Sequence, residues 1–225
     1  MVALDGPGGV GKSSVAREVA ARLGWLYIDT GAMYRAVTLA ATEQGLSLND
    51  EPALAQLART LQIELRPHPG GDPTIWLDGR DVSLAIRTNQ ISVATALVAD
   101  TPTVRHILVA HQRRLGEQGR VVMDGRDITT VVFPQARWKF YLDASLDERV
   151  QRRAEQLMAK GLWVNSEELA KQITERDRRD RIRPVGPLRI APGATVIDTT
   201  SLSFETVVQT LLAQVQAELS LPAAV

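Results

Sequence analysis

Residues 6–13 constrain the fold of this chain more than any other segment. They read Gly-Pro-Gly-Gly-Val-Gly-Lys-Ser and match the pattern G-x-x-x-x-G-K-[ST] at every position. A short apolar run, residues 1–4, precedes them, and a segment with helical periodicity, residues 15–23, follows. This strand–loop–helix setting is typical of a phosphate-binding loop, whereas a plain glycine-rich turn does not require all eight positions. The segment predicts a nucleoside triphosphate site in a domain built from strands and helices.

The loop carries the groups that bind a triphosphate. Its glycines let backbone N–H groups converge on phosphate oxygens, and the N-terminus of the following helix adds partial positive charge. We expect Lys12 to reach the β- and γ-phosphates and the Ser13 hydroxyl to bind Mg²⁺. The predicted triphosphate-binding residues of the loop are Gly6, Pro7, Gly8, Gly9, Val10, Gly11, Lys12 and Ser13.

The composition argues against several other classes of protein. No apolar run approaches the ~18 residues of a membrane span, and the phosphate loop starts too close to Met1 to leave room for a signal peptide. The chain has no cysteine, which excludes disulfides and thiolate metal sites. Its formal net charge is zero, which gives no general reason to bind a nucleic-acid polymer. We therefore expect a cytoplasmic protein with neither a membrane nor a nucleic-acid partner.

Strand-like apolar runs alternate with amphipathic helices along most of the chain. This alternation predicts an α/β fold with a central parallel sheet. Between residues 62 and 82 the pattern changes to short segments split by glycine and proline, which predicts a small inserted antiparallel sheet. The predicted strands of the main sheet cover residues 1–4, 25–28, 120–123, 139–142 and 195–197. The main predicted helices cover residues 15–23, 32–43, 51–61, 88–98, 145–160, 165–182 and 204–219, and a further helix starts at 101–102.

Residues 29–35 form the first candidate site beyond the phosphate loop. They follow a predicted strand, and ligands of open α/β sheets bind at the carboxyl ends of the strands. Thr30 and Arg35 are placed to hold the phosphate of an acceptor, with Tyr34 as a wall of the site. The alternative is a helix cap followed by a solvated arginine.

A second candidate site, Asp124-Gly125-Arg126-Asp127, follows the predicted strand at 120–123. In phosphate-loop proteins an acid at this point commonly supports Mg²⁺, so Asp124 is the candidate metal ligand. The alternative is structural, with the aspartates capping a loop and pairing with Arg126.

The third candidate is an arginine-rich helix, residues 176–183. At ~100° per residue, Arg176, Arg179, Asp180 and Arg183 share one face, and Asp180 is placed to orient its neighbours. Most charge-dense helices are solvated surfaces. The excess positive charge of this segment nevertheless suits phosphate binding.

These segments together make the chain resemble the bacterial cytidylate kinases, a branch of the P-loop nucleoside monophosphate kinases. The resemblance runs essentially from end to end. Two of its segments, 27–35 and 102–105, distinguish this family from adenylate, thymidylate and shikimate kinases. The residues that carry the resemblance are 6–14, 27–35, 78–87, 102–105, 124–127 with 131–134, and 175–177.

The resemblance implies a P-loop NTPase three-layer fold with a central parallel sheet. It also implies a small antiparallel β insertion in the region that binds the nucleoside monophosphate, and a helical lid. The single kinase chain would comprise a core at about 1–35, 115–150 and 184–225. The monophosphate-binding insertion would cover about 36–114, with its β-sheet at about 62–82, and the lid would cover about 151–183.

The resemblance further assigns the acceptor site. Thr30, Arg35 and Arg126 would bind the phosphate of CMP, with Tyr34 beside them. Arg176 and Asp180 would meet the ribose hydroxyls, with Arg183 nearby at the phosphate or base.

Arg105 and Asp127 would read the cytosine base. A carboxylate accepts a hydrogen bond from the N4 amino group, and an arginine donates to N3 and O2. Uracil presents an acceptor at position 4 and a donor at position 3, so both contacts would be mismatched.

On the donor side, the resemblance extends the ATP-binding loop to Ser14. It places Arg149, Arg152 and Arg153 on one helix face of the lid, from which Arg152 and Arg153 would reach the ATP phosphates. Ser13 and Asp124 would hold Mg²⁺. The residues expected to act in catalysis are Lys12, Arg126, Asp127 and Arg176.

The implied activity is transfer of the γ-phosphoryl group of Mg·ATP to CMP or dCMP, giving ADP and CDP or dCDP, by a chain acting as a monomer. One alternative is a UMP/CMP kinase or another small-molecule kinase of the same fold. Another is a nucleotide-dependent switch such as a GTPase, although no Asn-Lys-x-Asp motif is present. The chain departs from the family pattern at Thr129, where glycine is usual, and at Arg181, where serine is common. A serine contact to the base, found in some members, has no counterpart at Ala96.

Overall fold

A parallel sheet of five strands forms the centre of the protein. The computed structural model describes residues 1–66, 73–117, 119–159, 161–163 and 165–219. All pairings in the sheet are parallel, and the strand order is β2-β6-β1-β7-β8. Each strand ends in an aspartate, which brings five carboxylates to one edge of the sheet. The strands are β1 (Val2–Asp5), β2 (Leu26–Asp29), β6 (Val121–Asp124), β7 (Trp138–Asp143) and β8 (Thr195–Asp198).

Helices cover both faces of this sheet. The central strand β1 and its neighbour β6 are buried along their whole length, as expected for a parallel sheet between two helical layers. One face packs against α1 (Lys12–Leu23) and α8 (Phe204–Leu219) through a shared apolar core. The other face packs against α5 (Pro102–Gly116) and the π-helical turn η2 (Ile128–Val132). This confirms the predicted three-layer α/β fold.

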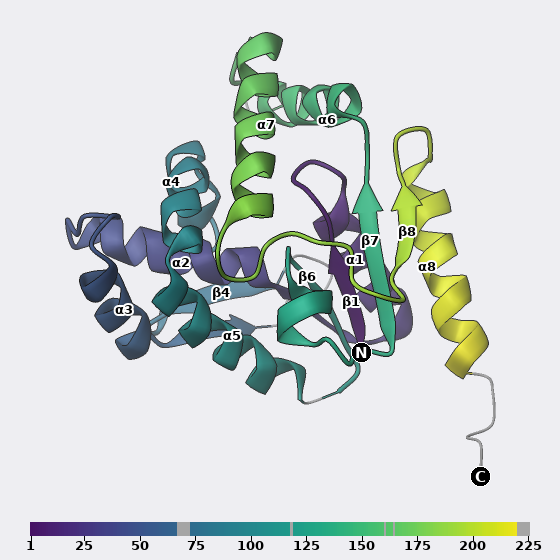
Figure 1. Ribbon diagram of the computed structural model, residues 1–225, viewed down its shortest axis with the longest axis horizontal. Coiled ribbons are helices and arrows are strands. Elements are labelled where there is room, and N and C mark those ends of the chain that lie inside the picture. The colour runs from purple at the N-terminus through teal and green to yellow at the C-terminus, as the bar shows by residue number, and fades with distance from the viewer. Residues whose placement is uncertain (67–72, 118, 160, 164, 220–225) are drawn as a thin grey trace.

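A helical region with a small antiparallel sheet lies to one side of the main sheet (Figure 1). Its three strands pair in the order β3-β4-β5, as the glycine- and proline-split pattern predicts. One apolar core joins β3 and β4 to the surrounding helices. The predicted turn at 67–72 lies outside the described residues. The elements are α2 (Thr30–Glu43), α3 (Glu51–Thr60), β3 (Ile63–Arg66), β4 (Thr74–Leu77), β5 (Arg80–Asp81), η1 (Ala85–Arg87) and α4 (Asn89–Asp100).

Two helices, α6 (Leu146–Met158) and α7 (Ser166–Ile182), lie beyond the carboxyl ends of the strands (Figure 1). Both begin where the sequence predicts. The Ser145 hydroxyl accepts a hydrogen bond from the Glu148 amide, and the Asn165 side chain accepts from the amides of Glu167 and Glu168. A small apolar cluster and a buried pair between Arg149 and Asp177 join the two helices to each other. The two helices lie where the helical lid is predicted, and both the lid role and its bounds at 151–183 remain a prediction.

Two local differences from the predicted elements matter for the site. Helix α2 starts at Thr30, two residues before the predicted start, because the Asp29 carboxylate caps it by accepting from the Ala32 amide at 2.9 Å. The turn η2 has no clear sequence signal, because it is only one turn long. In the described part of the chain, no helix is both long and apolar enough to cross a membrane.

Candidate active site

The phosphate loop joins the end of β1 to the start of α1. Gly6 has φ of 145°, and a Cβ at this position would lie 2.0 Å from the Leu142 carbonyl oxygen. Only glycine fits this approach, which holds the loop close to the neighbouring strand β7. The loop then ends at Gly11, the N-cap of α1. No side chain at this N-cap accepts a hydrogen bond from the first amides of the helix. The first N–H groups of α1 are therefore available to an anion.

Lys12 lies buried in this loop, with 4% of its surface exposed. Its ammonium group donates to the Pro7 carbonyl at 2.5 Å. Desolvation lowers the pKa of Lys12 well below its usual value, and the nearby Arg126 cation lowers it further. The nearby carboxylates of Asp124 and Asp5 do not fully offset these effects, so a phosphate group would stabilise the buried Lys12 cation.

The Ser13 hydroxyl donates to Asp124 at 2.9 Å, at the carboxyl end of β6. The Tyr27 hydroxyl donates to the same carboxylate at 2.8 Å. Burial raises the pKa of Asp124, and the neighbouring Asp29 raises it further, so an added cation would stabilise the ionised form. Among the described residues, no group of three or more His, Cys, Asp or Glu side chains lies close enough together to hold a metal ion. One serine and one carboxylate fit Mg²⁺, which usually takes few protein ligands and completes its shell with phosphate and water.

A polar pocket of about 230 Å³ opens beside Ser13. Arg35 donates to Asp29 at 2.7 Å, so the carboxylate that caps α2 also orients this arginine. Burial alone would raise the pKa of Asp29, but Arg35, the Ala32 amide and Arg87 together outweigh it and lower the pKa. The pocket is lined by Ser13, Arg17, Tyr27, Asp29, Arg35, Pro73, Ile75, Arg87, Ser92 and Arg153. Four arginines from different elements thus meet at one hollow, which suits an anionic ligand.

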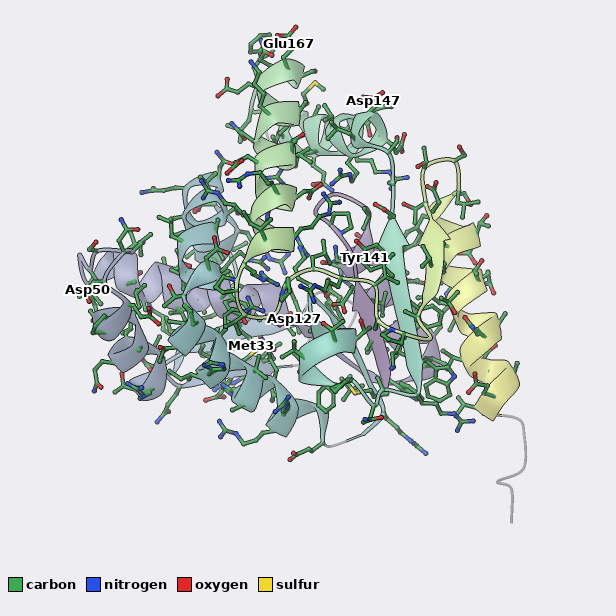
Figure 2. The ribbon with its side chains drawn as sticks, in the orientation of Figure 1. Met33, Asp50, Asp127, Tyr141, Asp147 and Glu167 are labelled. Atoms are coloured by element: carbon green, nitrogen blue, oxygen red, sulfur yellow. The ribbon has the colours of Figure 1, made fainter. Side chains whose placement is uncertain are left out.

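A set of arginine–carboxylate pairs, which we call the acceptor cluster, lies next to the phosphate loop. Arg105 from α5 donates to Asp127 at 2.5 Å. Asp180 from α7 accepts from Arg126 at 2.9 Å and from Arg183 at 3.2 Å. The cluster consists of Arg105, Arg126, Asp127, Asp180 and Arg183. Figure 2 shows its labelled member, Asp127, near the centre of the molecule, below the lower end of α7.

The acceptor cluster holds buried donors that lack a hydrogen-bond acceptor. They are Arg105 Nε and Arg183 Nη2, within the part of the chain that the structure describes. Burial would raise the pKa of Asp180, but the neighbouring arginines outweigh it and lower the pKa below the ordinary value. Since buried donors are nearly always paired in folded proteins, these two are expected to meet a ligand.

Arg176 lies close to the acceptor cluster without joining its hydrogen bonds. Desolvation and then the Arg126 cation lower the pKa of Arg176 to about 10, although its side chain reaches solvent. The Arg35 and Arg153 cations act in the same direction. Several predicted phosphate ligands therefore repel one another here, and an anion would relieve that repulsion.

Thr30 and Tyr34 line the same region from α2. The Thr30 hydroxyl donates to the Asp124 carbonyl at 2.7 Å, which links α2 to the carboxyl end of β6. The Tyr34 ring lies 5.3 Å from the Arg105 guanidinium, and burial raises the pKa of Tyr34 to about 12. Tyr34 therefore stays neutral and forms an apolar wall beside the arginine.

The three lid arginines predicted to share one face diverge in the structure. Arg153 lines the pocket beside Ser13. Arg152 instead donates to Glu148 and to the Thr199 carbonyl, both at 2.7 Å. Of the two predicted ATP-phosphate ligands in the lid, only Arg153 lies at the pocket.

Arg149 is the third of these arginines, and it is buried. It donates to Asp177 of α7 at 2.6 Å and to the Gly8 carbonyl at 3.3 Å. The pair links the two lid helices to the phosphate loop. Asp177 carries no signal in the sequence that separates it from its charged neighbours, because its partner lies 28 residues away. Arg179, predicted on the same face as Asp180, pairs with Glu175 instead.

Three comparisons with known proteins agree with this geometry. A family model described as cytidylate kinase matches residues 2–217. The chain is 48% identical over 216 residues to a cytidylate kinase of Pelotomaculum thermopropionicum, with 96% of each chain covered. It is 49% identical over 211 residues to one of Geobacillus kaustophilus, with 94% of each covered.

A bifunctional pantoate ligase/cytidylate kinase of a Synechococcus species is 52% identical over 205 residues. That match covers 90% of this chain and 38% of the longer protein. Among solved structures, an uncharacterized protein from Eubacterium ventriosum has a TM-score of 0.53 at 8% identity. It covers 96% of this chain and 97% of its own, and this likeness bears on the fold alone.

Proposed function

The chain belongs to the cytidylate kinase family, and we propose that it transfers the γ-phosphoryl group of ATP to CMP or dCMP. The products are ADP and CDP or dCDP. An oxygen of the acceptor phosphate attacks the γ-phosphorus, and the bond from that phosphorus to the β-γ bridging oxygen breaks. The acceptor phosphate is already ionised at neutral pH, so no strong general base is needed. The enzyme must position the two phosphates and neutralise their charge.

On the donor side, the phosphate loop binds the triphosphate through its backbone N–H groups and Lys12. Ser13 and Asp124 would hold Mg²⁺, which supplies positive charge to the β- and γ-phosphates when bound. Arg153 reaches the same region from the lid, where α6 and α7 exclude water once they close. The residues of α6 and α7 would form the moving part of the chain. The small antiparallel sheet would belong to the monophosphate-binding part, and the main sheet would belong to the core.

On the acceptor side, Thr30, Arg35 and Arg126 bind the CMP phosphate, and Arg176 lies where the two phosphates would meet. Asp180 accepts from a ribose hydroxyl while Arg183 holds it in place.

The base would be read by Arg105 and Asp127. Cytosine offers the N4 amino group to the carboxylate, and the unpaired Arg105 Nε supports a donor contact to N3 or O2. Uracil reverses the pattern at positions 3 and 4 and would leave buried groups unpaired.

One observation carries this proposal. One short segment at the end of β6, residues 124–127, carries the proposed metal carboxylate Asp124, the proposed phosphate ligand Arg126 and the proposed base reader Asp127, and the last two are already paired with Asp180 and Arg105. Their order along the chain matches the order of the groups to be bound, which is the metal ion, the phosphate of CMP and then the cytosine base. We further propose that the protein is a cytoplasmic monomer that uses Mg²⁺.

A coupled assay of ADP release tests the function directly. CMP and dCMP should support fast release, and UMP and AMP much slower release. Equal use of UMP and CMP would favour a UMP/CMP kinase of the same fold. Release without any acceptor would favour a nucleotide-hydrolysing switch.

A further inference from the structure

Asp5 is a fully buried carboxylate to which the function above assigns no part. It is the last residue of β1 and 0% exposed. Its two oxygens accept three hydrogen bonds, all from the start of η2. Oδ1 accepts from the Ile128 amide at 2.8 Å, and Oδ2 accepts from the Thr129 amide at 2.7 Å and the Thr129 hydroxyl at 2.5 Å.

These three bonds fix the backbone directly after the base-reading residue. Asp127 is the N-cap of η2, but its side chain makes no capping bond. The first N–H groups of a helical turn have no partner inside the turn. Asp5 supplies their acceptors from another strand, which leaves the Asp127 carboxylate available to Arg105 and the base.

The other end of this connection is equally fixed. Asp5 directly precedes Gly6, the first residue of the phosphate loop, where the approach to the Leu142 carbonyl leaves no room for a side chain. One carboxylate therefore joins the start of the donor loop to the residue after Asp127. Burial raises the pKa of Asp5 to about 6 against the opposing effect of its hydrogen bonds, so above neutral pH the group is ionised and accepts all three.

We propose that Asp5 is a positioning residue that holds Asp127 in register with the phosphate loop, and that the Thr129 hydroxyl is its additional anchor. The inference rests on the proposed role of Asp127 in reading cytosine. A glycine at position 129 would keep the backbone bond and lose the hydroxyl bond. The Thr129 hydroxyl thus adds a third hydrogen bond between Asp5 and η2 that a glycine could not make.

The test replaces Thr129 by valine, which keeps the shape and deletes only the hydroxyl bond. The matched control is Thr130→Val, one position along the same turn. The Thr130 hydroxyl has no hydrogen-bond partner in the described part of the chain. Thr129→Ser keeps the hydroxyl, and Thr129→Ala also deletes it, together with the methyl group, should the valine variant fail to fold. The readouts are KM for CMP, KM for ATP, and the ratio of kcat/KM for CMP to that for UMP.

For Thr129→Val we expect KM for CMP to rise about three- to tenfold, less than the full worth of a hydrogen bond to a charged group because the two backbone bonds to Asp5 remain. The CMP-to-UMP ratio should fall by a similar factor, with KM for ATP changing less than about twofold. Thr129→Ser should recover most of the loss, and Thr130→Val should match the wild type.

Two results would overturn the inference in different ways. In the first, the wild type prefers CMP but Thr129→Val leaves KM and selectivity unchanged. This outcome would refute the positioning role and leave the proposed base reading intact. In that case a lower melting temperature would mark Thr129 as a purely structural residue. A wild type with no preference for CMP over UMP would contradict the proposed base reading itself, and the inference with it.

Discussion

The phosphate loop and the acceptor cluster bind their ligands by different means. The loop presents backbone N–H groups and one buried lysine, which recognise phosphate and carry no information about the base. The acceptor cluster presents side chains that are already paired, Arg105 with Asp127 and Arg126 with Asp180, at 2.5 and 2.9 Å. Every nucleoside triphosphate offers the loop the same phosphates, whereas the proposed function requires that only cytosine satisfies the acceptor cluster. On that proposal, the loop supplies charge for the reaction rate, and the acceptor cluster selects the substrate.

The largest effect should come from Lys12→Met, which keeps the length of the side chain and removes its charge. We expect kcat to fall by on the order of 10²-fold or more, because such contacts stabilise the transferred phosphoryl group by several kcal/mol. The loss should be similar for CMP, dCMP and UMP, so the selectivity between acceptors should persist. Near-normal turnover in a folded variant would refute the donor-loop assignment.

Unlike Lys12→Met, Asp127→Asn should change the selectivity between acceptors. The amide keeps the size of the side chain but no longer accepts at both oxygens, so the CMP-to-UMP ratio of kcat/KM should shrink. A base-reading contact is worth ~1–3 kcal/mol, or about 5- to 150-fold. ATP affinity, measured separately by titration, should change little. Parallel losses for CMP and UMP at an unchanged ratio would assign Asp127 to the metal or the loop instead.

Asp180→Ala tests sugar recognition within the acceptor cluster. The change leaves Arg126 and Arg183 without their shared carboxylate, so every substrate should lose some activity. CMP should lose more than dCMP if the 2′-hydroxyl is the partner, by roughly tenfold in relative kcat/KM. Equal losses for the two substrates would make Asp180 a support for the arginines alone.

The smallest effect should separate the two lid arginines. Arg153 lines the pocket beside Ser13, whereas Arg152 is held by Glu148 and Thr199. We expect Arg153→Ala to raise KM for ATP or lower kcat by about two- to fivefold, as for a partly exposed charge worth ~0.5–1 kcal/mol. Arg152→Ala should cause the smaller of the two losses. The reverse order, in steady-state kinetics at low salt, would place Arg152 at the phosphates when the lid closes.

The difference between the phosphate loop and the acceptor cluster also explains which parts of the site the sequence predicts. The phosphate loop is local, so the spacing of its residues predicts its position, and the caps of α6 and α7 are predicted for the same reason. The acceptor cluster is assembled from distant residues. Arg105 and Asp127 lie 22 positions apart, and Arg126 and Asp180 lie 54 apart.

Spacing alone cannot show such pairs. The resemblance to a family placed Arg105 and Asp127 together at the base, but it assigned Arg126 and Asp180 to different parts of CMP and did not predict that they pair. The bond from Asp5 to Thr129 spans 124 positions and had no signal beyond a charge at the end of an apolar strand. The divergence of Arg152 from Arg153 likewise depends on Thr199, a residue from the far end of the chain.

A matrix of donors and acceptors tests the difference between the two regions most directly. The wild-type enzyme is assayed with ATP or GTP as donor and with CMP or UMP as acceptor, and kcat/KM is measured for each combination. Replacing CMP by UMP should lower kcat/KM by at least about tenfold, within the range of base-edge discrimination. Replacing ATP by GTP should cost distinctly less, since the loop contacts phosphates that both donors share. A larger effect of the donor base than of the acceptor base would contradict the assignment of substrate identity to the acceptor cluster.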